Sequence, residues 1–270
     1  MSLNVALTIA GSDTSGGAGI QADLKTFQEL GVFGMSAINV IATMSPENWS
    51  HSTFPISLDA FKAQMDTVLS VKIDALKTGM LTSVEVIEII AKTIDDHQFA
   101  NVVIDPVMVC KGDDKVLNPH TAGAIRDLLV PRALVVTPNL FEASQLAGTA
   151  PIKTVDDMKE AAAKIHELGA KNVIVKGGKG LDHDQAIDVF YDGKEFKLYE
   201  NEKINTTYVH GAGCTFSAAI TAELAKGKSV PEAVDLAKDF VTAAIRHGFQ
   251  LNQFVGPTMH MAYRKYGTEK

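Results

Sequence analysis

The chain has few cysteines, no block of basic residues and no long apolar segment. Its two cysteines, Cys110 and Cys214, are too few for a disulfide framework and are typical of a reducing compartment. A formal net charge of −7 without a basic block argues against a nucleic-acid-binding surface. No apolar run approaches the roughly 18 residues of a membrane span, and residues 1–10 lack the basic start of a signal peptide. We therefore expect a cytoplasmic protein without a signal peptide that binds neither nucleic acid nor membranes.

Hydrophobic residues make up 46% of the chain, which is enough for a sizeable core. Strand and helix patterns alternate without a linker or repeat, which predicts a single α/β domain over residues 1–270. This alternation is typical of a mostly parallel central sheet with helices on both faces. Strands are expected at residues 5–10, 35–42, 73–77, 102–105, 134–137 and 173–175, and a hairpin at 186–191 and 195–200. Helices are expected at residues 20–30, after Leu58, and at 84–94, 122–129, 155–168 and 230–246.

Polar and glycine-rich segments follow the predicted strands. In open α/β sheets, ligands bind beyond the carboxyl ends of the strands. Any one of these segments can be ordinary turn chemistry, but together they predict a ligand site. The segments are residues 11–19, Gly79-Met80, Asp105, Asn139 with Glu142, and residues 176–180. The polar segment 45–51 is either a mobile flap over that site or a surface loop.

A glycine-rich turn leads into a helix of small residues near residues 207–220. Such a turn lets backbone N–H groups converge, and the helix N-terminus adds a partial positive charge. We call residues 210–214 the anion-hole turn, because this pattern predicts a binding site for a phosphoryl group during its transfer. Cys214 stands at the predicted helix start, where the pKa of a thiol is lowered. The alternative is a helix start whose glycines only relieve crowding.

Charged side chains at the strand ends are suited to phosphoryl transfer. Asp105 and Glu142 can hold Mg²⁺ directly or through water, with Asn139 as a neutral oxygen donor. Lys176 can neutralise phosphate oxygens of ATP, and the glycines after it let the nucleotide approach the backbone. Cys214 is the candidate base for the attacking hydroxyl. Asp105 can alternatively form an Asx-turn before the proline that follows it.

These motifs together resemble the ribokinase-like superfamily, and within it the branch of hydroxymethylpyrimidine kinases and related bacterial pyridoxine/pyridoxal kinases. The resemblance extends from residue 6 to about residue 257. It implies the ribokinase-like fold, ATP and Mg²⁺ as cofactors, and a homodimer. It also implies transfer of the γ-phosphoryl group to a hydroxymethyl group on a small heteroaromatic substrate. The motifs that carry it are residues 7–13, 15–25, 77–81, 103–108, 137–143, 175–178 and 210–215.

The resemblance also assigns roles to individual residues. The catalytic group is Cys214 with Gly211, Ala212 and Gly213. The ATP-binding group is Lys176, Gly177, Gly178, Asn139 and Glu142. The substrate-binding group is Gly11, Asp13, Gly17, Met44, Met80, Val107 and Cys110. The metal-binding group is Asp105 and Glu142.

Two positions bear on the substrate and the base. Most of the superfamily ends the anion-hole motif in Asp, whereas this chain has Cys214, as is usual in the hydroxymethylpyrimidine branch. Hydroxymethylpyrimidine kinases commonly carry a Gln that pairs with the aminopyrimidine, and the matching residue here is Met44 unless it lies one position off. A thioether cannot make that pair but can pack on a ring. Together with Lys111-Gly112, which resembles the pyridoxal-type members, Met44 favours a pyridine substrate.

We therefore predict an ATP-dependent kinase of the vitamin B6 vitamers pyridoxal, pyridoxine and pyridoxamine. The alternative is a hydroxymethylpyrimidine or hydroxymethylpyrimidine phosphate kinase of thiamine biosynthesis, possessed alone or as a second activity. A nucleoside or sugar kinase fits the cysteine-ending turn less well. A non-catalytic binding protein on the same fold conflicts with the intact set of charged residues. Cys110 or Cys214 can also add to the aldehyde of pyridoxal, although Cys110 can equally be a small buried apolar residue.

Overall fold

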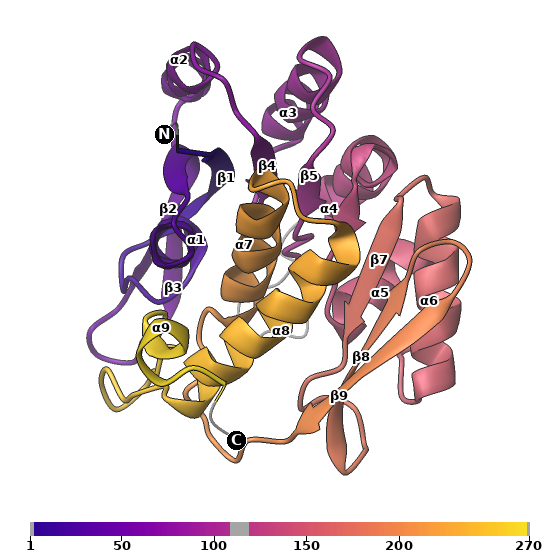
Figure 1. Ribbon diagram of the computed structural model, residues 1–270. Helices are drawn as coiled ribbons and strands as arrows, with labels where there is room; N and C mark the ends of the chain where they lie inside the picture. The colour runs from indigo at the N-terminus through magenta and orange to yellow at the C-terminus, as the bar shows by residue number, and fades with distance from the viewer. Residues whose placement is uncertain (1–2, 109–118, 269–270) are drawn as a thin grey trace. The chain divides into compact units, whose positions relative to one another are not determined.

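The computed structural model describes residues 3–108 and 119–268, so Cys110 and Lys111-Gly112 lie outside the described residues. The chain forms two compact units: the first comprises residues 1–82 and 204–270, and the second comprises residues 83–203. Each unit contains parallel strands with an antiparallel edge, and helices pack on them (Figure 1). None of the helices in the described ranges combines the length and the apolar character that crossing a membrane requires.

Within the part of the first unit that the structure describes, four strands lie in the order β3-β2-β1-β4. β1 (Val5–Asp13) pairs in parallel with β2 (Phe33–Met44) and with β4 (Ala75–Thr78), and β3 (His51–Pro55) pairs antiparallel with β2. β1 is longer than predicted, because the ladder resumes at Gly11 after a register shift and continues to Asp13. The predicted glycine-rich break therefore begins only after Asp13.

Residues 45–50 form the hairpin turn between β2 and β3. The backbone N–H of Ser45 donates to the carbonyl of Ser50 over 2.9 Å, and that of Trp49 donates to the carbonyl of Ser45 over 2.9 Å. β3 was not predicted from the sequence, because all of its residues are exposed and it has no alternating apolar pattern. The segment expected as a flap or loop is thus largely a hairpin turn, and its closing motion stays a prediction.

The helices in the described part of the first unit are α1 (Gly19–Glu29), α2 (Leu58–Val68), α7 (Ala212–Ala225), α8 (Val230–Arg246) and α9 (Ala262–Tyr266). α1 packs on β1, β2 and α7, and α7 in turn packs on β1, β4 and α8 (Figure 1). α8 begins and ends where the sequence predicts, with a capping box between Ser229 and Glu232. The packing buries Leu7, Phe27 and Phe240 almost completely.

The described residues of the second unit form five strands in the order β5-β6-β7-β8-β9. β5 (Val102–Ile104), β6 (Val135–Val136) and β7 (Asn172–Lys176) are parallel, whereas β8 (Gln185–Tyr191) and β9 (Phe196–Glu202) form an antiparallel hairpin beside β7. This hairpin confirms the prediction for that part of the chain. The carboxylate of Asp192 shapes its turn by accepting hydrogen bonds from the N–H groups of Lys194 and Glu195.

The helices of the second unit differ from the prediction in two places. The predicted helix at residues 122–129 is α4 (Pro119–Ala124) followed by a π-helical turn (Ile125–Leu129). A further helix, α5 (Leu140–Ala147), begins directly after the predicted strand end. α3 (Val84–Asp96) and α6 (Val155–Glu167) lie where the sequence predicts helices.

Candidate active site

The anion-hole turn leads into α7 through Gly211, which has φ of 81° in the left-handed region. A Cβ at Gly211 would collide with the carbonyl oxygen of Gly17, so this position requires glycine for two reasons. The carbonyl oxygen of Gly211 accepts hydrogen bonds from the N–H and the hydroxyl of Thr215, both over 2.8 Å. The first turn of an α-helix presents N–H groups without intrahelical acceptors, which suits a phosphate oxygen.

Cys214 is the third residue of α7, and its side chain is partly exposed. The first turn of α7, all of which is described, contains no acidic side chain to offset the partial positive charge of the helix start. A thiol in this position matches the placement that the sequence predicts. Its role as a base stays a prediction.

Asp13 is the centre of a hydrogen-bond cluster beside the anion-hole turn. Its carboxylate accepts from the N–H groups of Ser15 and Ala18 over 2.8 Å each and from the Ser15 hydroxyl over 2.9 Å. The Nε2 atom of His210 lies 2.8 Å from Oδ2 of Asp13. Burial by itself would raise the pKa of Asp13, but the bonds from His210 and Ser15 outweigh it and lower the pKa from 3.8 to about 2. Asp13 is therefore ionised at neutral pH.

Gly11 and Met80 come together at the ends of β1 and β4. A Cβ at Gly11 would lie 2.9 Å from Cε of Met80, so glycine leaves room for the methionine side chain. The buried side chain of Asn39 holds this segment by donating to the carbonyl of Met80 over 2.9 Å. Met44 ends β2, two residues beyond Ala42, which is the partner of Asp13 in the β1–β2 ladder.

Asp105 follows β5 in the second unit and is buried with 3% of its surface exposed. Its Oδ1 atom lies 3.3 Å from Nζ of Lys176 and accepts a hydrogen bond from the Thr137 hydroxyl over 3.3 Å. The N–H of Val107 donates to the carbonyl of Asp105 over 2.9 Å. The backbone N–H of Lys176 donates to the carbonyl of Pro138 over 2.8 Å, so Lys176 lies beside the segment that follows β6. The structure thus pairs the predicted metal carboxylate with the predicted phosphate lysine.

Glu142 and Asn139 form the capping box that starts α5. The N–H of Asn139 donates to Oε2 of Glu142 over 2.8 Å, and the N–H of Glu142 donates to Oδ1 of Asn139 over 2.9 Å. Burial raises the pKa of Glu142, Lys176 lowers it and Asp105 raises it, with a net rise from 4.5 to about 7. The three charged groups therefore interact, and the carboxyl of Glu142 titrates near neutral pH.

Gly177 lies where β7 meets β8. Its N–H donates to the carbonyl of Ile187 and to Oδ1 of Asp188, both over 3.0 Å, and a Cβ there would collide with that carbonyl. Glycine is therefore required at this position because the backbone of β8 lies too close for a side chain. Gly178 has φ of 51°, and a Cβ added there would point into open space. The proposed approach of a nucleotide to these glycines stays a prediction.

Among the described residues, no group of three or more His, Cys, Asp or Glu side chains forms a metal-binding cluster. Mg²⁺ commonly uses one or two carboxylates and takes its other ligands from water and substrate phosphates. Asp105 and Glu142 fit that mode, because both are buried carboxylates whose charges interact. They do not fit a site in which protein side chains alone surround the ion.

The structure distributes the predicted residues over both units. The first unit contains Gly11, Asp13, Gly17, Met44, Met80, Gly211, Ala212, Gly213 and Cys214. The second unit contains Asp105, Val107, Asn139, Glu142, Lys176, Gly177 and Gly178. Sequence reasoning assigned no role to His210, Ser15, Asn39, Thr137 or Asp188. His210 gave a signal because it stands next to the glycines of the anion-hole turn, and Ser15 and Thr137 lie within motifs that carry the family resemblance.

Comparison with known proteins gives the family. Residues 13–259 match the phosphomethylpyrimidine kinase family. Pyridoxine kinase of Bacillus subtilis is 60% identical over 266 residues, which cover 98% of each chain. Hydroxymethylpyrimidine/phosphomethylpyrimidine kinase of the same organism is 42% identical over 98% of this chain and 97% of that one. Pyridoxal kinase of Staphylococcus aureus, solved in complex with AMP-PCP and pyridoxal, superposes with a TM-score of 0.94 at 49% identity, covering 98% of this chain and 96% of that one. The chain belongs to the phosphomethylpyrimidine kinase family and has its ribokinase-like fold.

Proposed function

We propose that this chain is an ATP-dependent kinase that phosphorylates the hydroxymethyl group of pyridoxal, pyridoxine and pyridoxamine, which gives the 5'-phosphates. The observation that carries the proposal is the 60% identity to a pyridoxine kinase over 98% of both chains. Met44 supports it, because a thioether packs on a pyridine ring but cannot pair with an aminopyrimidine. Pyridoxal is also one of the molecules bound to the Staphylococcus aureus relative.

The second unit carries the residues that we assign to ATP. Lys176 supplies positive charge for the phosphate oxygens, and the carboxylate of Asp105 at 3.3 Å orients its ammonium group. Asp105 and Glu142 are the residues that would hold Mg²⁺, which supplies charge neutralisation to the phosphates when bound. Because the pKa of Glu142 is raised to about 7 even with the charge of Lys176 lowering it, the carboxyl needs a further nearby cation to stay fully ionised at neutral pH.

The first unit carries the residues that we assign to the phosphoryl acceptor. The N–H groups of the anion-hole turn stabilise negative charge that develops on the phosphoryl oxygens. The thiol of Cys214, when ionised, accepts the proton of the attacking hydroxymethyl group. Gly11 and Met80 pack together at the strand ends and form part of the substrate pocket.

A second candidate is the phosphorylation of hydroxymethylpyrimidine and its phosphate. The family description and the 42% identity to a hydroxymethylpyrimidine/phosphomethylpyrimidine kinase favour it as an alternative or additional activity. We further propose that the protein acts in the cytoplasm as a homodimer. The low cysteine content supports a reducing compartment, and the family resemblance supports the dimer.

Initial rates with ATP and Mg²⁺ on pyridoxal, pyridoxine and hydroxymethylpyrimidine, measured side by side, test the proposal. We expect the two vitamers to give higher kcat/KM than hydroxymethylpyrimidine. The Lys176→Ala variant, purified in the same way, controls for contaminating kinases. A higher kcat/KM for hydroxymethylpyrimidine would reverse the assignment, and the absence of turnover on all three substrates would refute it.

A further inference from the structure

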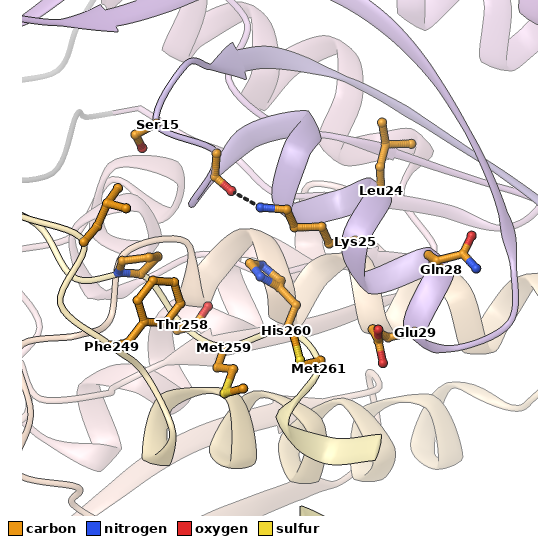
Figure 2. A pocket seen from close by; sticks show the side chains of 13 residues that line it. Ser15, Leu24, Lys25, Gln28, Glu29, Phe249, Thr258, Met259, His260 and Met261 are labelled. Carbon is orange, nitrogen blue, oxygen red and sulfur yellow. Dashed lines mark hydrogen bonds between the residues drawn. The ribbon is translucent and has the colours of Figure 1, made fainter. Parts of the chain in front are cut away.

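A cavity of about 590 Å³ lies in the first unit between α1 and the C-terminal segment of residues 249–261 (Figure 2). Small-molecule sites typically have volumes of roughly 300–1,000 Å³ and mostly apolar walls. None of the residues that line this cavity is assigned above to ATP, substrate or metal. The apolar part of its lining includes Leu24, Phe249, Leu251, Met259 and Met261.

The polar part of the cavity contains a cation without a counter-ion. Nζ of Lys25 donates to the carbonyl of Gly16 over 2.7 Å (Figure 2), and within the described residues no carboxylate pairs with it. Glu29 also lines the cavity, but its carboxylate is bound by Arg264 over 2.6 and 3.2 Å. An ammonium group beside apolar walls is stabilised when an anion binds next to it. The cavity therefore favours a negatively charged ligand.

Two buried polar groups line the same cavity. The hydroxyl of Thr258 has no hydrogen-bond partner among the described residues, although Thr258 is only 1% exposed. His260 is 8% exposed, and Figure 2 shows its ring near the Lys25 side chain. Burial and then the charge of Lys25 lower the pKa of His260 to about 4, so the ring is neutral at physiological pH and adds no second charge. The ammonium of Lys25 is therefore the positively charged group of this cavity that attracts an anion.

We propose that this cavity binds a small aromatic anion with one carboxylate or phosphate group. The ring packs against Phe249 and Met259, and the anionic group binds the ammonium of Lys25. This site goes beyond the proposed kinase activity and lies outside the residues assigned to it.

Two hydrogen-bonded connections link the cavity to the anion-hole turn. Lys25 holds the carbonyl of Gly16, and Gly16 precedes Gly17, which packs against Gly211. His260 places Nε2 at 3.1 Å from the hydroxyl of Thr215, and that hydroxyl donates to the carbonyl of Gly211. An anion that draws Lys25 away from Gly16 loosens the first connection. Occupancy of the cavity is therefore expected to change the rate of phosphoryl transfer.

Fluorine NMR tests the binding without catalysis, so the result stays readable even if the kinase assignment fails. The probes are 4-fluorobenzoate and 4-fluorophenyl phosphate, which distinguish the two anionic groups, and 4-fluorobenzamide is the uncharged control. We expect at least one anion to bind the wild-type protein and the amide not to bind. Lys25→Met should weaken that binding roughly tenfold or more, because it removes a charge-assisted hydrogen bond.

Matched variants separate the cavity from other anion sites. Phe249→Glu places a negative charge on the wall and should weaken binding at least as much, whereas Lys62→Met on the exposed face of α2 should leave binding unchanged. Melting temperatures confirm that each variant is folded. Undiminished binding in both Lys25→Met and Phe249→Glu, or equal binding of the amide, would overturn the proposal. The proposal would also be overturned if no probe binds. Dissociation of a dimer by Phe249→Glu would then identify the cavity as an interface with a second copy.

Discussion

The Nε2 atom of His210 lies 2.8 Å from Oδ2 of Asp13, and this contact joins the end of β1 to the anion-hole turn. The backbone of His210 is held as well, because its N–H donates to Gly256 and its carbonyl accepts from Thr258, both over 3.1 Å. With four donors around its carboxylate, Asp13 keeps the segment of residues 15–18 against Gly211. We interpret the pair as a positioning device for the N–H groups of α7.

Asp13→Asn should therefore lower kcat more than it raises KM for ATP. The amide keeps a similar shape but loses the charge and part of the acceptor capacity that hold His210 and residues 15–18. A misplacement of about 1 Å can lower the rate about 10²-fold. His210→Gln should act in the same direction, and Ser15→Ala, which removes one donor of the cluster, should have a small effect. Wild-type kcat in both Asp13→Asn and His210→Gln would show that the pair does not position the turn.

Much of the fold could be predicted from the apolar periodicity and the capping residues of the sequence. α8 is amphipathic over its whole length and begins with Ser, Pro and Glu at capping positions, so its bounds could be predicted. β3 could not, because its five exposed residues form a strand only through pairing with β2. α5 was missed because Asn139 and Glu142 were interpreted as ligands, whereas the same residues also form a capping box.

The candidate site was predictable where glycines and charges follow strands, and less so where partners are distant in sequence. Lys176 and Asp105 were both assigned, but nothing local to either residue indicates that they pair across 71 positions. The Asp13–His210 contact spans 197 positions and was missed for the same reason. Gly211 was predicted to be glycine so that backbone N–H groups can bind a phosphate. The structure adds a second reason for glycine there, which is the close approach of Gly211 to Gly17.

Lys176→Ala should lower kcat/KM, because it removes the positive charge that we assign to the transferred phosphoryl group. Loss of one such stabilising group typically lowers kcat by about 10²- to 10³-fold. Lys176 pairs with the buried Asp105, so unfolding by denaturant must be measured on the same variant. Lys179→Ala, at an exposed lysine of the same loop, is the matched control and should be active. A Lys176→Ala enzyme with wild-type kinetics would refute the assignment.

Glu142 should make the protein less stable as the pH rises. Its pKa is raised from 4.5 to about 7, so the folded state binds more protons than the unfolded state between these values. The contribution of Glu142 to the free energy of unfolding is about 3 kcal/mol. It is fully present below about pH 4.5 and is lost as the pH rises to about 7. The pKa of Asp13 is lowered, so its contribution to stability changes with pH in the opposite direction, but that change lies between about pH 2 and pH 3.8.

Urea unfolding with a chelator present, at pH 5 and pH 8, measures this loss for the wild type and for Glu142→Gln. The difference between the two proteins isolates Glu142 from other titrating groups. We expect the wild type to lose more stability than the variant between the two pH values. Mg²⁺ together with a nucleotide should reduce the loss for the wild type, because a cation favours the ionised carboxylate. Equal pH dependence in both proteins would contradict the raised pKa.

Met44→Gln should shift selectivity toward hydroxymethylpyrimidine. Met44 ends β2 and is partly exposed, so an amide can replace the thioether without opening a cavity in the core. An amide can pair with an aminopyrimidine, and a site built to form such a bond discriminates strongly. The measurement is the ratio of kcat/KM for hydroxymethylpyrimidine to that for pyridoxal. An unchanged ratio in a folded variant would mean that residue 44 does not line the substrate pocket.

Cys214 provides the sharpest test of the proposed chemistry, because its role depends on a proton rather than on binding. If its thiolate accepts the proton of the hydroxymethyl group, Cys214→Ala should lower kcat by about 10²- to 10⁴-fold and leave KM for both substrates nearly unchanged. Cys214→Asp should recover part of the rate, since a carboxylate at this position can accept the same proton. Cys214→Ser, with a similar shape and a much weaker acid, should not recover it.

The pH profile of kcat separates a base from a residue that only shapes the turn. With a thiolate as base, kcat should rise with pH through the pKa of the thiol and then level off. In Cys214→Asp the rising limb should move to lower pH, because a carboxyl group ionises earlier. A structural role would lower kcat without moving that limb. A Cys214→Ala enzyme with near wild-type kcat would exclude the thiol as base, and the N–H groups of α7 would then remain as the only assigned contribution of this turn to phosphoryl transfer.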